Sequence, residues 1–238
     1  MAEAALAIEG LVTGYDRRDV LTGISLDLPD GALVTVVGPN GHGKTTLLRA
    51  ISGLLPTRRG SIRLFGKKLA GLAPHQVAAA GIVHVPQGDL LFPQMSVHEN
   101  LLMGAYLENN QAVIRRRLEE VEALLPKLAE RRDQLASSLS GGERRMVGIG
   151  RGLMMGGQVM LIDEPSLGLA PIIIEQVYEV IARLKASGRT ILLVEENPAR
   201  VADLADAIHL LDNGRIVWSG PPHDLLERDE LLETYLGG

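Results

Sequence analysis

Cysteine is absent from the sequence, which excludes disulfide bonds and thiolate metal sites and fits a reducing compartment. Aromatic residues make up only 3% of the chain, although hydrophobic residues as a whole reach 46%. A core with these proportions is packed mainly by leucine, isoleucine, valine and alanine. Such a composition suits buried parallel strands under helices, so we expect an α/β protein.

Long hydrophobic runs and an excess of positive charge are missing too. No apolar stretch approaches the roughly 20 residues of a membrane-spanning helix, and MAEAALAIEG at the N-terminus lacks the pattern of a secretory signal. We therefore expect a cytoplasmic protein. Acidic side chains outnumber basic ones, 29 to 24, so no nucleic acid is expected as a partner.

Short apolar runs alternate with segments of helical periodicity along most of the chain. Continuously apolar runs are typical of parallel strands covered on both faces. The predicted parallel strands are Leu33–Val37, Ile82–Val85, Val159–Ile162, Thr190–Val194 and Ala207–Leu211. A further antiparallel set is expected at Leu6–Ile8, Ile24–Leu28 and Ser61–Leu64. Between residues 87 and 140 only helical spacing occurs, which indicates a helical insertion.

The stretch GPNGHGKTT, residues 38–46, lies between a predicted strand and an apolar helix start. It fits G-x-x-x-x-G-K-[ST], whose glycines let consecutive backbone N–H groups point into one concavity at a helix N-terminus. We expect a phosphate cradle in which Lys44 bridges the β- and γ-phosphates and Thr45 ligates Mg²⁺. The predicted nucleotide contacts are Asn40, Gly41, His42, Gly43, Lys44, Thr45 and Thr46, with the His42 ring pointing outward. The alternative is a glycine-rich turn without a ligand.

The run VMLIDEPS, residues 159–166, ends a predicted strand with two carboxylates. Parallel sheets bind ligands at the carboxyl ends of their strands. Asp163 is predicted to hold Mg²⁺, and Glu164 to polarise an attacking water as general base. The alternative is an ordinary acidic strand end.

A third motif, LSGGERRMVGIGRGLMM at residues 139–155, predicts a helix that begins with Ser140 as N-cap. The glycines Gly141 and Gly142 would expose the first N–H groups, and such a helix end binds anions. Taken alone, the stretch is more typical of a capped surface helix than of an anion site.

The order GPNGHGKTT, VPQG, LSGGE, LIDEP resembles the nucleotide-binding subunits of ATP-binding cassette (ABC) transporters over nearly the whole chain. The resemblance implies a P-loop NTPase fold with a RecA-like, mostly parallel sheet, an antiparallel β subdomain and an inserted helical subdomain. We expect one nucleotide-binding domain over residues 1–238. Its core, with the β subdomain, would span 1–87 and 155–238, and the helical subdomain 88–154.

The same resemblance implies roles for particular residues. Two subunits pair head to tail in this family, so Ser140, Gly141 and Gly142 would act on the γ-phosphate held by the other subunit. Tyr15, with Val20 nearby, matches the position that stacks on adenine. Gln87 matches the glutamine that reaches Mg²⁺ and the attacking water.

The stretches VPQGDLLFPQMSVHENLLMGAY and DEPSLGLAP are similar to the LivF-like subunit of importers for branched-chain amino acids and related amides. The implied partners are a second, non-identical, LivG-like ATPase, two membrane permeases and a periplasmic binding protein, with the complex at the inner face of the cell membrane. A homodimer is possible for the isolated subunit. An apolar cluster beside Gln87 is a candidate permease contact; it comprises Leu90, Leu91, Phe92 and Met95.

Two positions depart from the wider family. Glu196 stands where most members place a histidine that senses the γ-phosphate, and Ala170 stands where an aspartate crosses the dimer interface. A carboxylate would repel the phosphate, so Glu196 either turns away or weakens this chain's own site. We attribute the remaining candidate histidines to solvent exposure or core packing; they are His84, His98 and His209. The arginine clusters 115–117 and 131–132 are expected to be solvated.

Two other classes of function stay open at this point. A soluble cassette ATPase of translation or repair usually carries two such modules or long basic segments, and neither occurs here. A regulatory module that binds nucleotide without turnover is favoured by Glu196 and opposed by Glu164.

Overall fold

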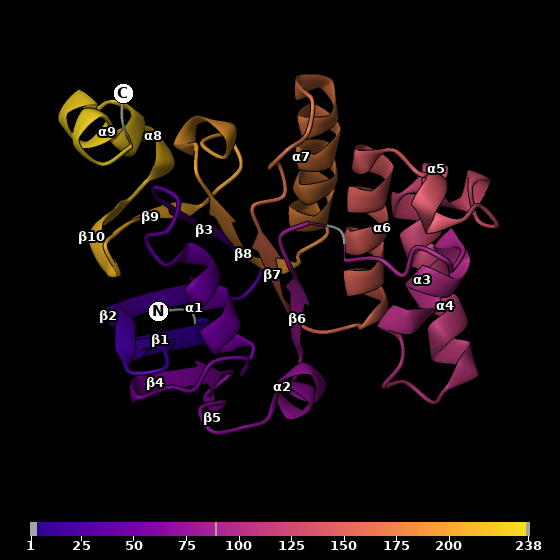
Figure 1. Ribbon diagram of the computed structural model, residues 1–238, viewed down its shortest axis with the longest axis horizontal. Helices are drawn as coiled ribbons and strands as arrows, with labels where there is room; N and C mark the ends of the chain where they lie inside the picture. The colour runs from indigo at the N-terminus through magenta and orange to yellow at the C-terminus, as the bar shows by residue number, and fades with distance from the viewer. Residues whose placement is uncertain (1–3, 89, 237–238) are drawn as a thin grey trace.

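The computed structural model describes residues 4–88 and 90–236, and its strands form two sheets (Figure 1). One sheet is antiparallel, in the order β2-β1-β4-β5, and the other has the order β10-β9-β3-β8-β7-β6. The first comprises β1 (Ala4–Tyr15), β2 (Arg18–Pro29), β4 (Arg59–Leu64) and β5 (Lys67–Lys68). The second comprises β3 (Leu33–Val37), β6 (Ile82–Val85), β7 (Val159–Asp163), β8 (Thr190–Glu195), β9 (Ala207–Asp212) and β10 (Arg215–Gly220).

In the six-stranded sheet, β3, β6, β7, β8 and β9 run parallel, and β10 pairs with β9 antiparallel. The five predicted parallel strands are confirmed, and three of them end one residue later than predicted. The strand β10 was not predicted, because its residues alternate between exposed and half-buried and form no continuous apolar run. The predicted antiparallel set is also confirmed, although β1 and β2 are much longer than the predicted cores.

Both faces of the parallel sheet are covered, which explains why most residues of its central strands are apolar. Side chains alternate across a strand, so Val34 and Val36 of β3 face one hydrophobic cluster while Leu33 and Val37 face the other. The first cluster includes helix α1 (Lys44–Ile51) and the antiparallel sheet. The second includes helices α6 (Gly141–Met154) and α7 (Pro171–Ala186). In Figure 1, α1 and α7 lie on opposite sides of the strands between them.

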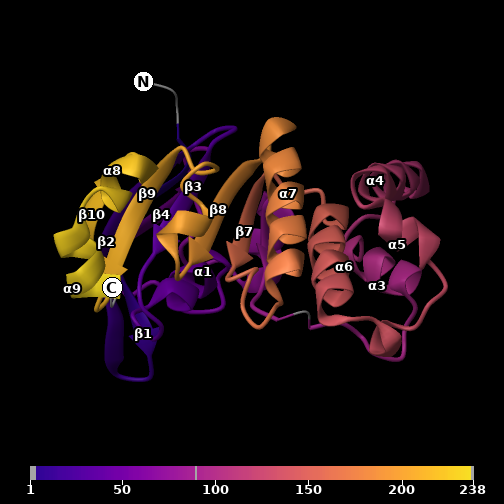
Figure 2. The ribbon, with the colours of Figure 1, turned by 90° about the horizontal axis from the view of Figure 1, so that it is seen from above.

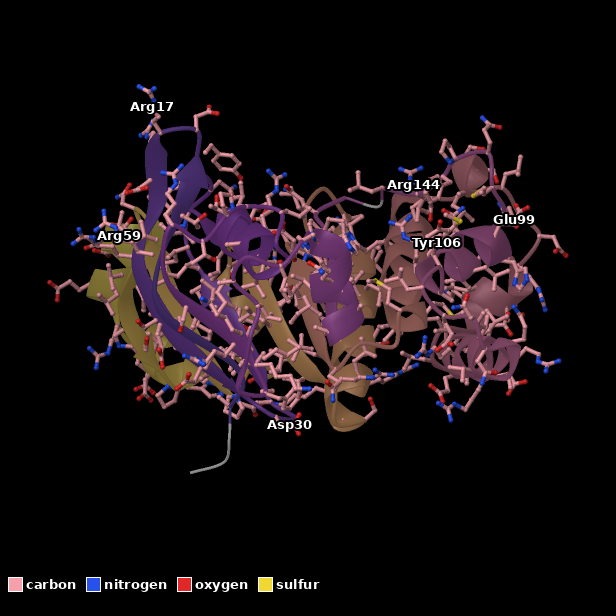
Figure 3. All side chains as sticks on the ribbon, turned by 90° about the horizontal axis from the view of Figure 1, so that it is seen from below. Arg17, Asp30, Arg59, Glu99, Tyr106 and Arg144 are labelled. Atoms are coloured by element: carbon pink, nitrogen blue, oxygen red, sulfur yellow. The ribbon has the colours of Figure 1, made fainter. Side chains whose placement is uncertain are left out.

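The described residues between β6 and β7 form helices and connecting loops, as predicted for the insertion. In sequence order they are α3 (Val97–Gly104), α4 (Gln111–Leu124), α5 (Pro126–Glu130), the 3₁₀ turn Ala136–Ser138 and α6. These helices lie at the end of the molecule away from the antiparallel sheet (Figures 1 and 2). Figure 3 shows Arg17 of the β1–β2 hairpin on one side of the molecule and Glu99 and Tyr106 on the other.

Helix α6 packs against both the parallel sheet and the inserted helices. A Cβ atom at Gly152 would lie 2.7 Å from Val85 Cγ2 of β6, and one at Gly150 would lie 2.8 Å from Leu101 Cδ2 of α3. Side chains at these two positions would push the helix away from its neighbours. The division into a core and a subdomain at residues 88–154 stays a prediction, and α6 is the element shared between the two.

The remaining helices of the described chain are α2 (Pro74–Ala80), α8 (Pro222–Leu226) and α9 (Asp229–Leu236), and a second 3₁₀ turn spans Pro198–Arg200. Among the described residues, no helix has the combined length and hydrophobicity that crossing a bilayer requires. Within the arginine clusters, Arg115, Arg116 and Arg132 are exposed as expected, whereas Arg117 and Arg131 are half-buried. Arg117 donates to Met154 O at 3.2 Å and lies 3.5 Å from a Glu108 carboxylate oxygen. Exposed Arg116 pairs only with Glu120 among the interactions described.

Candidate active site

The predicted phosphate cradle lies between β3 and α1. Gly41 and Gly43 have φ values of 83° and 113°, in the left-handed region that glycine adopts without strain. A Cβ atom at Gly38 would lie 2.1 Å from Leu211 O of β9, so the loop approaches this strand closely. Gly43 is the N-cap of α1, and no side chain caps the helix. The first N–H groups of α1 are therefore available to an anion.

Lys44 is the most enclosed cation of the cradle, with a relative exposure of 3%. Its ammonium donates to Gly38 O at 2.7 Å, Pro39 O at 3.1 Å and Asn40 Oδ1 at 3.3 Å. It also lies 3.0 Å from Glu164 Oε1. These contacts hold the charge inside the loop, where a phosphate would meet it without the cost of ordering a flexible side chain.

Strand β7 delivers two carboxylates to the same edge of the sheet. Thr45 Oγ1 donates to Asp163 Oδ1 at 3.1 Å, and Gln87 Nε2 donates to Glu164 Oε2 at 3.1 Å. Burial raises the pKa of Asp163 to about 6, and the neighbouring charge of Glu164 adds to the shift. The bond from Thr45 and the nearby cations Arg49 and Lys44 oppose it. The structure thus brings together the predicted residues from the loop, β7 and the segment after β6.

The donor set at Asp163 fits Mg²⁺. Thr45, Asp163 and Gln87 offer hydroxyl, carboxylate and amide oxygens, which are the hard ligands that Mg²⁺ prefers. The described residues contain no group of three or more histidine, cysteine, aspartate or glutamate side chains able to hold a metal. A magnesium ion here would therefore take its remaining ligands from water and from substrate phosphates, as this ion usually does.

Tyr15 and Val20 lie on the antiparallel side of the cradle. The Tyr15 hydroxyl accepts from Arg49 Nη1 of α1 at 3.1 Å, and its ring is 38% exposed. A Cβ atom at Gly43 would lie 3.5 Å from Val20 Cγ1. Both residues are thus near the loop, with the Tyr15 ring accessible for stacking on a flat ligand.

The expected orientation of His42 is wrong. Its ring is not turned freely outward, because Nδ1 lies 2.8 Å from Asp212 Oδ1 at the end of β9 and 3.2 Å from the Asn213 backbone N. The side chain is 27% exposed. His42 therefore ties the cradle to the turn after β9.

The other three candidate histidines each have a side-chain partner. His84 Nδ1 lies 2.9 Å from Ser52 Oγ, and burial lowers the pKa of His84 to about 4, with the positive charge of Arg49 adding to the effect. His98 and His209 bond to Arg132 and Ser219. Unexpectedly, His84 also lines a cavity of about 440 Å³ together with Thr45, Gln87 and Asp163.

The third motif begins a helix as predicted. Ser140 is the N-cap of α6, and Glu143 Oε2 accepts from the Ser140 backbone N at 2.8 Å and from its hydroxyl at 2.9 Å. These bonds lower the pKa of Glu143, which also pairs with Arg131 at 2.8 Å. Strand β7 lies between α6 and α1 in both Figures 1 and 2. Within one chain, the structure does not bring the α6 start to Lys44.

Glu195, a residue that the sequence patterns did not single out, differs in burial from the two unusual positions, Glu196 and Ala170. Glu196 and Ala170 are exposed, whereas Glu195, one residue before Glu196, is 1% exposed at the end of β8. Its carboxylate accepts from Ser166, from Tyr178 at 2.6 Å and from the Glu196 backbone N at 2.6 Å. A signal was present in ILLVEEN, because the first glutamate directly follows an apolar run of a strand that is covered on both faces.

Comparisons with known proteins agree with this geometry. The family model described as ABC transporter matches residues 21–167. The high-affinity branched-chain amino acid transport ATP-binding protein BraG of Pseudomonas aeruginosa is 40% identical over 98% of this chain and 100% of its own. The probable branched-chain amino acid transport ATP-binding protein LivF of Archaeoglobus fulgidus is 34% identical over 95% and 96%. A crystal structure of an ABC transporter's ATP-binding cassette in its ADP conformation has a TM-score of 0.88 at 28% identity, covering 99% of each chain.

Proposed function

Because the chain belongs to the ABC transporter family and is an ATP-binding subunit whose ATP hydrolysis is coupled to transport, we propose that it energises an importer of branched-chain or other hydrophobic amino acids, or of related amides. The names of the two relatives above support this class of cargo. One observation carries the proposed mechanism. At one edge of the sheet, the Glu164 carboxylate lies 3.0 Å from the Lys44 ammonium and accepts from Gln87 at 3.1 Å.

In the proposed reaction the β- and γ-phosphates of ATP lie against the N–H groups of the cradle and the ammonium of Lys44. A water attacks the γ-phosphorus, the bond to the β-γ bridging oxygen breaks, and the Glu164 carboxylate takes a proton from the water. Gln87, which donates to Glu164 Oε2, orients that carboxylate. Mg²⁺, held by Thr45, Asp163 and Gln87, would neutralise the charge that develops on the phosphate oxygens.

We propose that Ser140, Gly141 and Gly142 act on ATP held by a second, LivG-like ATPase subunit. The start of α6 is exposed at Ser140 and Gly141 and lies apart from this chain's own Lys44, which supports a role in trans. Backbone N–H groups at a helix N-terminus bind phosphate, so a facing subunit would complete its site with this helix end.

The permeases are proposed to dock beside the inserted helices, with this subunit at the cytoplasmic face of the membrane. A cavity of about 720 Å³ is lined mainly by apolar side chains, several of them strongly exposed, together with Glu108, Arg117 and Arg151. Among them Leu90 is 64%, Phe92 44%, Tyr106 79% and Leu107 56% exposed. Figure 3 shows Tyr106 in this half of the molecule. An apolar groove of this kind fits a short amphipathic helix of a permease.

Two of the four residues predicted for this contact are exposed, namely Leu90 and Phe92, whereas Leu91 and Met95 are partly buried. Leu91 packs against the core cluster. Tyr106 and Leu107 were not predicted, because they follow α3 and stand far from Gln87 in the sequence.

The experiment that tests this function is uptake by proteoliposomes containing this chain, its partner ATPase, both permeases and the binding protein. We expect ATP-dependent uptake of leucine, isoleucine and valine or of short amides, and none when both ATPases carry alanine at the phosphate-loop lysine. ATP hydrolysis without uptake of any of these solutes would assign the subunit to a transporter with another cargo.

We further propose that the pair is asymmetric, with the partner's phosphate loop and this chain's Ser140–Gly142 forming the stronger site. The exposed carboxylate of Glu196 and the methyl group of Ala170 support a weaker site at Lys44. Replacing Glu164 by Gln in the mixed complex should then leave part of the ATP turnover and transport. Complete loss of both would contradict the asymmetry.

A further inference from the structure

The buried carboxylate of Glu195 contacts two separate loops of the site. One is the loop after β7, residues 164–170, where Ser166 donates its hydroxyl to Glu195 Oε1. The other is the loop after β8, where the backbone N of Glu196 donates to Glu195 Oε2 at 2.6 Å. A carboxylate that accepts bonds on both oxygens fixes the relative position of the groups that donate them.

Two further residues complete this cluster. Tyr178 of α7 donates its hydroxyl to Glu195 Oε1 at 2.6 Å, and its pKa is raised by burial and by the neighbouring Glu195 charge. Arg200 donates to Ser166 Oγ at 2.7 Å and lies 3.8 Å from Glu195 Oε2. The Ser166 side chain is thus held from two sides, by an acceptor and by a donor, and its residue is 3% exposed.

The loop that Ser166 anchors begins with a strained residue. Glu164 has a φ of 41°, a left-handed conformation that is strained for a residue with a side chain. Its N–H donates to Val194 O at 3.0 Å, and Leu167 N donates to Glu164 O at 3.2 Å. Such a conformation persists only where surrounding contacts enforce it. Ser166 lies inside the turn closed by Glu164 and Leu167.

We propose that Glu195 is a positioning residue that acts through Ser166 to keep the turn 164–167 in the conformation that directs the Glu164 carboxylate at the attacking water. The inference rests on the proposed role of Glu164 as general base. Glu195 itself contacts neither Lys44 nor Gln87 in the described contacts, so its effect is transmitted through the backbone of the turn.

The loop held by Ser166 also reaches the start of α6. The loop that begins at Ser166 continues to Leu169, whose Cδ2 lies 3.6 Å from the position of a Cβ atom on Gly141. Displacing the loop would therefore disturb both the base at this chain's site and the helix end proposed to serve the partner's site.

The test uses the assembled transporter in which the partner's phosphate-loop lysine is replaced by alanine, so that turnover reports this chain's site. Glu195→Gln offers one oxygen in place of two, and Ser166→Ala removes the link to the turn. We expect each to lower kcat roughly 10- to 100-fold, the scale of a misplaced reacting group. The KM for ATP should stay within about twofold, because the cradle is unaffected.

Thr190→Val is the matched control, since Thr190 is 1% exposed on the same strand and bonds to Asp30 and Gly31 at its opposite end. It should lower stability but leave kcat within about twofold. Hydrogen exchange on the purified chain supplies a second measurement. The amides of Glu164 and Glu196 should exchange faster in Glu195→Gln and Ser166→Ala than in the wild type or Thr190→Val.

The outcomes separate the two proposals. If Glu164→Gln is inactive in this complex, two outcomes would overturn the positioning role alone. One is an unchanged kcat in both Glu195→Gln and Ser166→Ala, and the other is an equal loss of kcat in Thr190→Val. Wild-type turnover in Glu164→Gln would instead overturn the role proposed for the base.

Discussion

Two helices of this protein begin with glycines that expose backbone N–H groups, and their surroundings differ. At the start of α1, Gly43 caps the helix without a side chain, and Lys44 is buried among contacts from its own loop and Glu164. At the start of α6, Ser140 is exposed and its hydroxyl bonds to Glu143. The first end has a buried cation and two carboxylates beside it, whereas at the second end Glu143 bonds to the helix start and pairs with Arg131.

This difference indicates which half of an ATP site the chain supplies at each place. A phosphate at α1 finds a cation, a candidate metal site and a candidate base, which together are sufficient for binding. A phosphate at α6 must compete with Glu143, whose pKa is lowered by its bonds to Ser140 and which therefore remains an anion at neutral pH. We expect the α1 end to bind ATP in the isolated chain and the α6 end to contribute only in an assembled pair.

The strongest test of the comparison is Lys44→Ala. Loss of a charge-assisted contact to phosphate should weaken ATP binding roughly 10- to 100-fold and lower turnover at this site about 100- to 1000-fold. Calorimetry on the purified chain measures the first effect, and phosphate release by the complex with an inactivated partner site measures the second. Lys68→Ala, on the exposed strand β5, is the control. Tight binding by Lys44→Ala would contradict the assignment of the α1 end.

A fall in pH should lower stability through a group beside α1 rather than through one at the start of α6. His84 bonds to Ser52 at the end of α1, and its pKa is about 4 in the folded protein against 6.5 for an unburied histidine. The stability from the neutral ring is present above pH 6.5 and is lost as pH falls toward 4, by about 2 kcal/mol between pH 7 and pH 5.

Urea unfolding at these two pH values, compared between the wild type and His84→Gln, measures this loss, because protonation of Asp163, whose pKa is raised to about 6, acts in the opposite direction over the same range. His84→Gln should remove that part of the pH dependence, whereas replacement of exposed His75 by Gln should retain it. An unchanged pH dependence in His84→Gln would show that the protonation of other groups dominates.

Alanine substitutions at the two glycines that begin α6 are expected to have different effects on stability. A Cβ atom at Gly142 would lie 2.4 Å from Ile173 Cγ2 of α7, whereas one at Gly141 has its nearest atom, Leu169 Cδ2, at 3.6 Å. Gly142→Ala should therefore lower the free energy of unfolding by about 1 to 3 kcal/mol. Gly141→Ala should be neutral or slightly stabilising, because alanine favours a helix. Equal effects in urea unfolding would mean that α6 and α7 repack freely.

A modest effect is expected for Ser140→Ala, which removes an N-cap and should cost about 1 kcal/mol of stability. Ser96 of α3 forms the same capping arrangement with Glu99, so Ser96→Ala should cost a similar amount. ATP affinity of the isolated chain should stay within about twofold in both variants. In the assembled complex only Ser140→Ala should lower turnover, and an equal loss in Ser96→Ala would indicate a purely structural role.

Sequence patterns predicted the local parts of this molecule well. The bounds of β3 and β6 match the predicted runs to the residue, because a strand covered on both faces reads as one apolar block. The half-exposed edge strand β10 gave no such block. The His42 ring was placed wrongly because its partner Asp212 lies 170 residues further along the chain. Glu195 was missed for a related reason, since its partners come from α7 and from two loops.

What the sequence determined by itself is the chemistry available at each position: a glycine loop before a helix, two carboxylates after an apolar strand, a serine before two glycines. These follow from backbone propensities and from spacing within a few residues. Only the tertiary structure decided that Gln87 and Glu164, 77 residues apart, meet at 3.1 Å, and that Glu195 faces inward while Glu196 does not. Such contacts depend on strand order and on burial, which hydrophobic packing of the whole chain fixes and no short segment encodes.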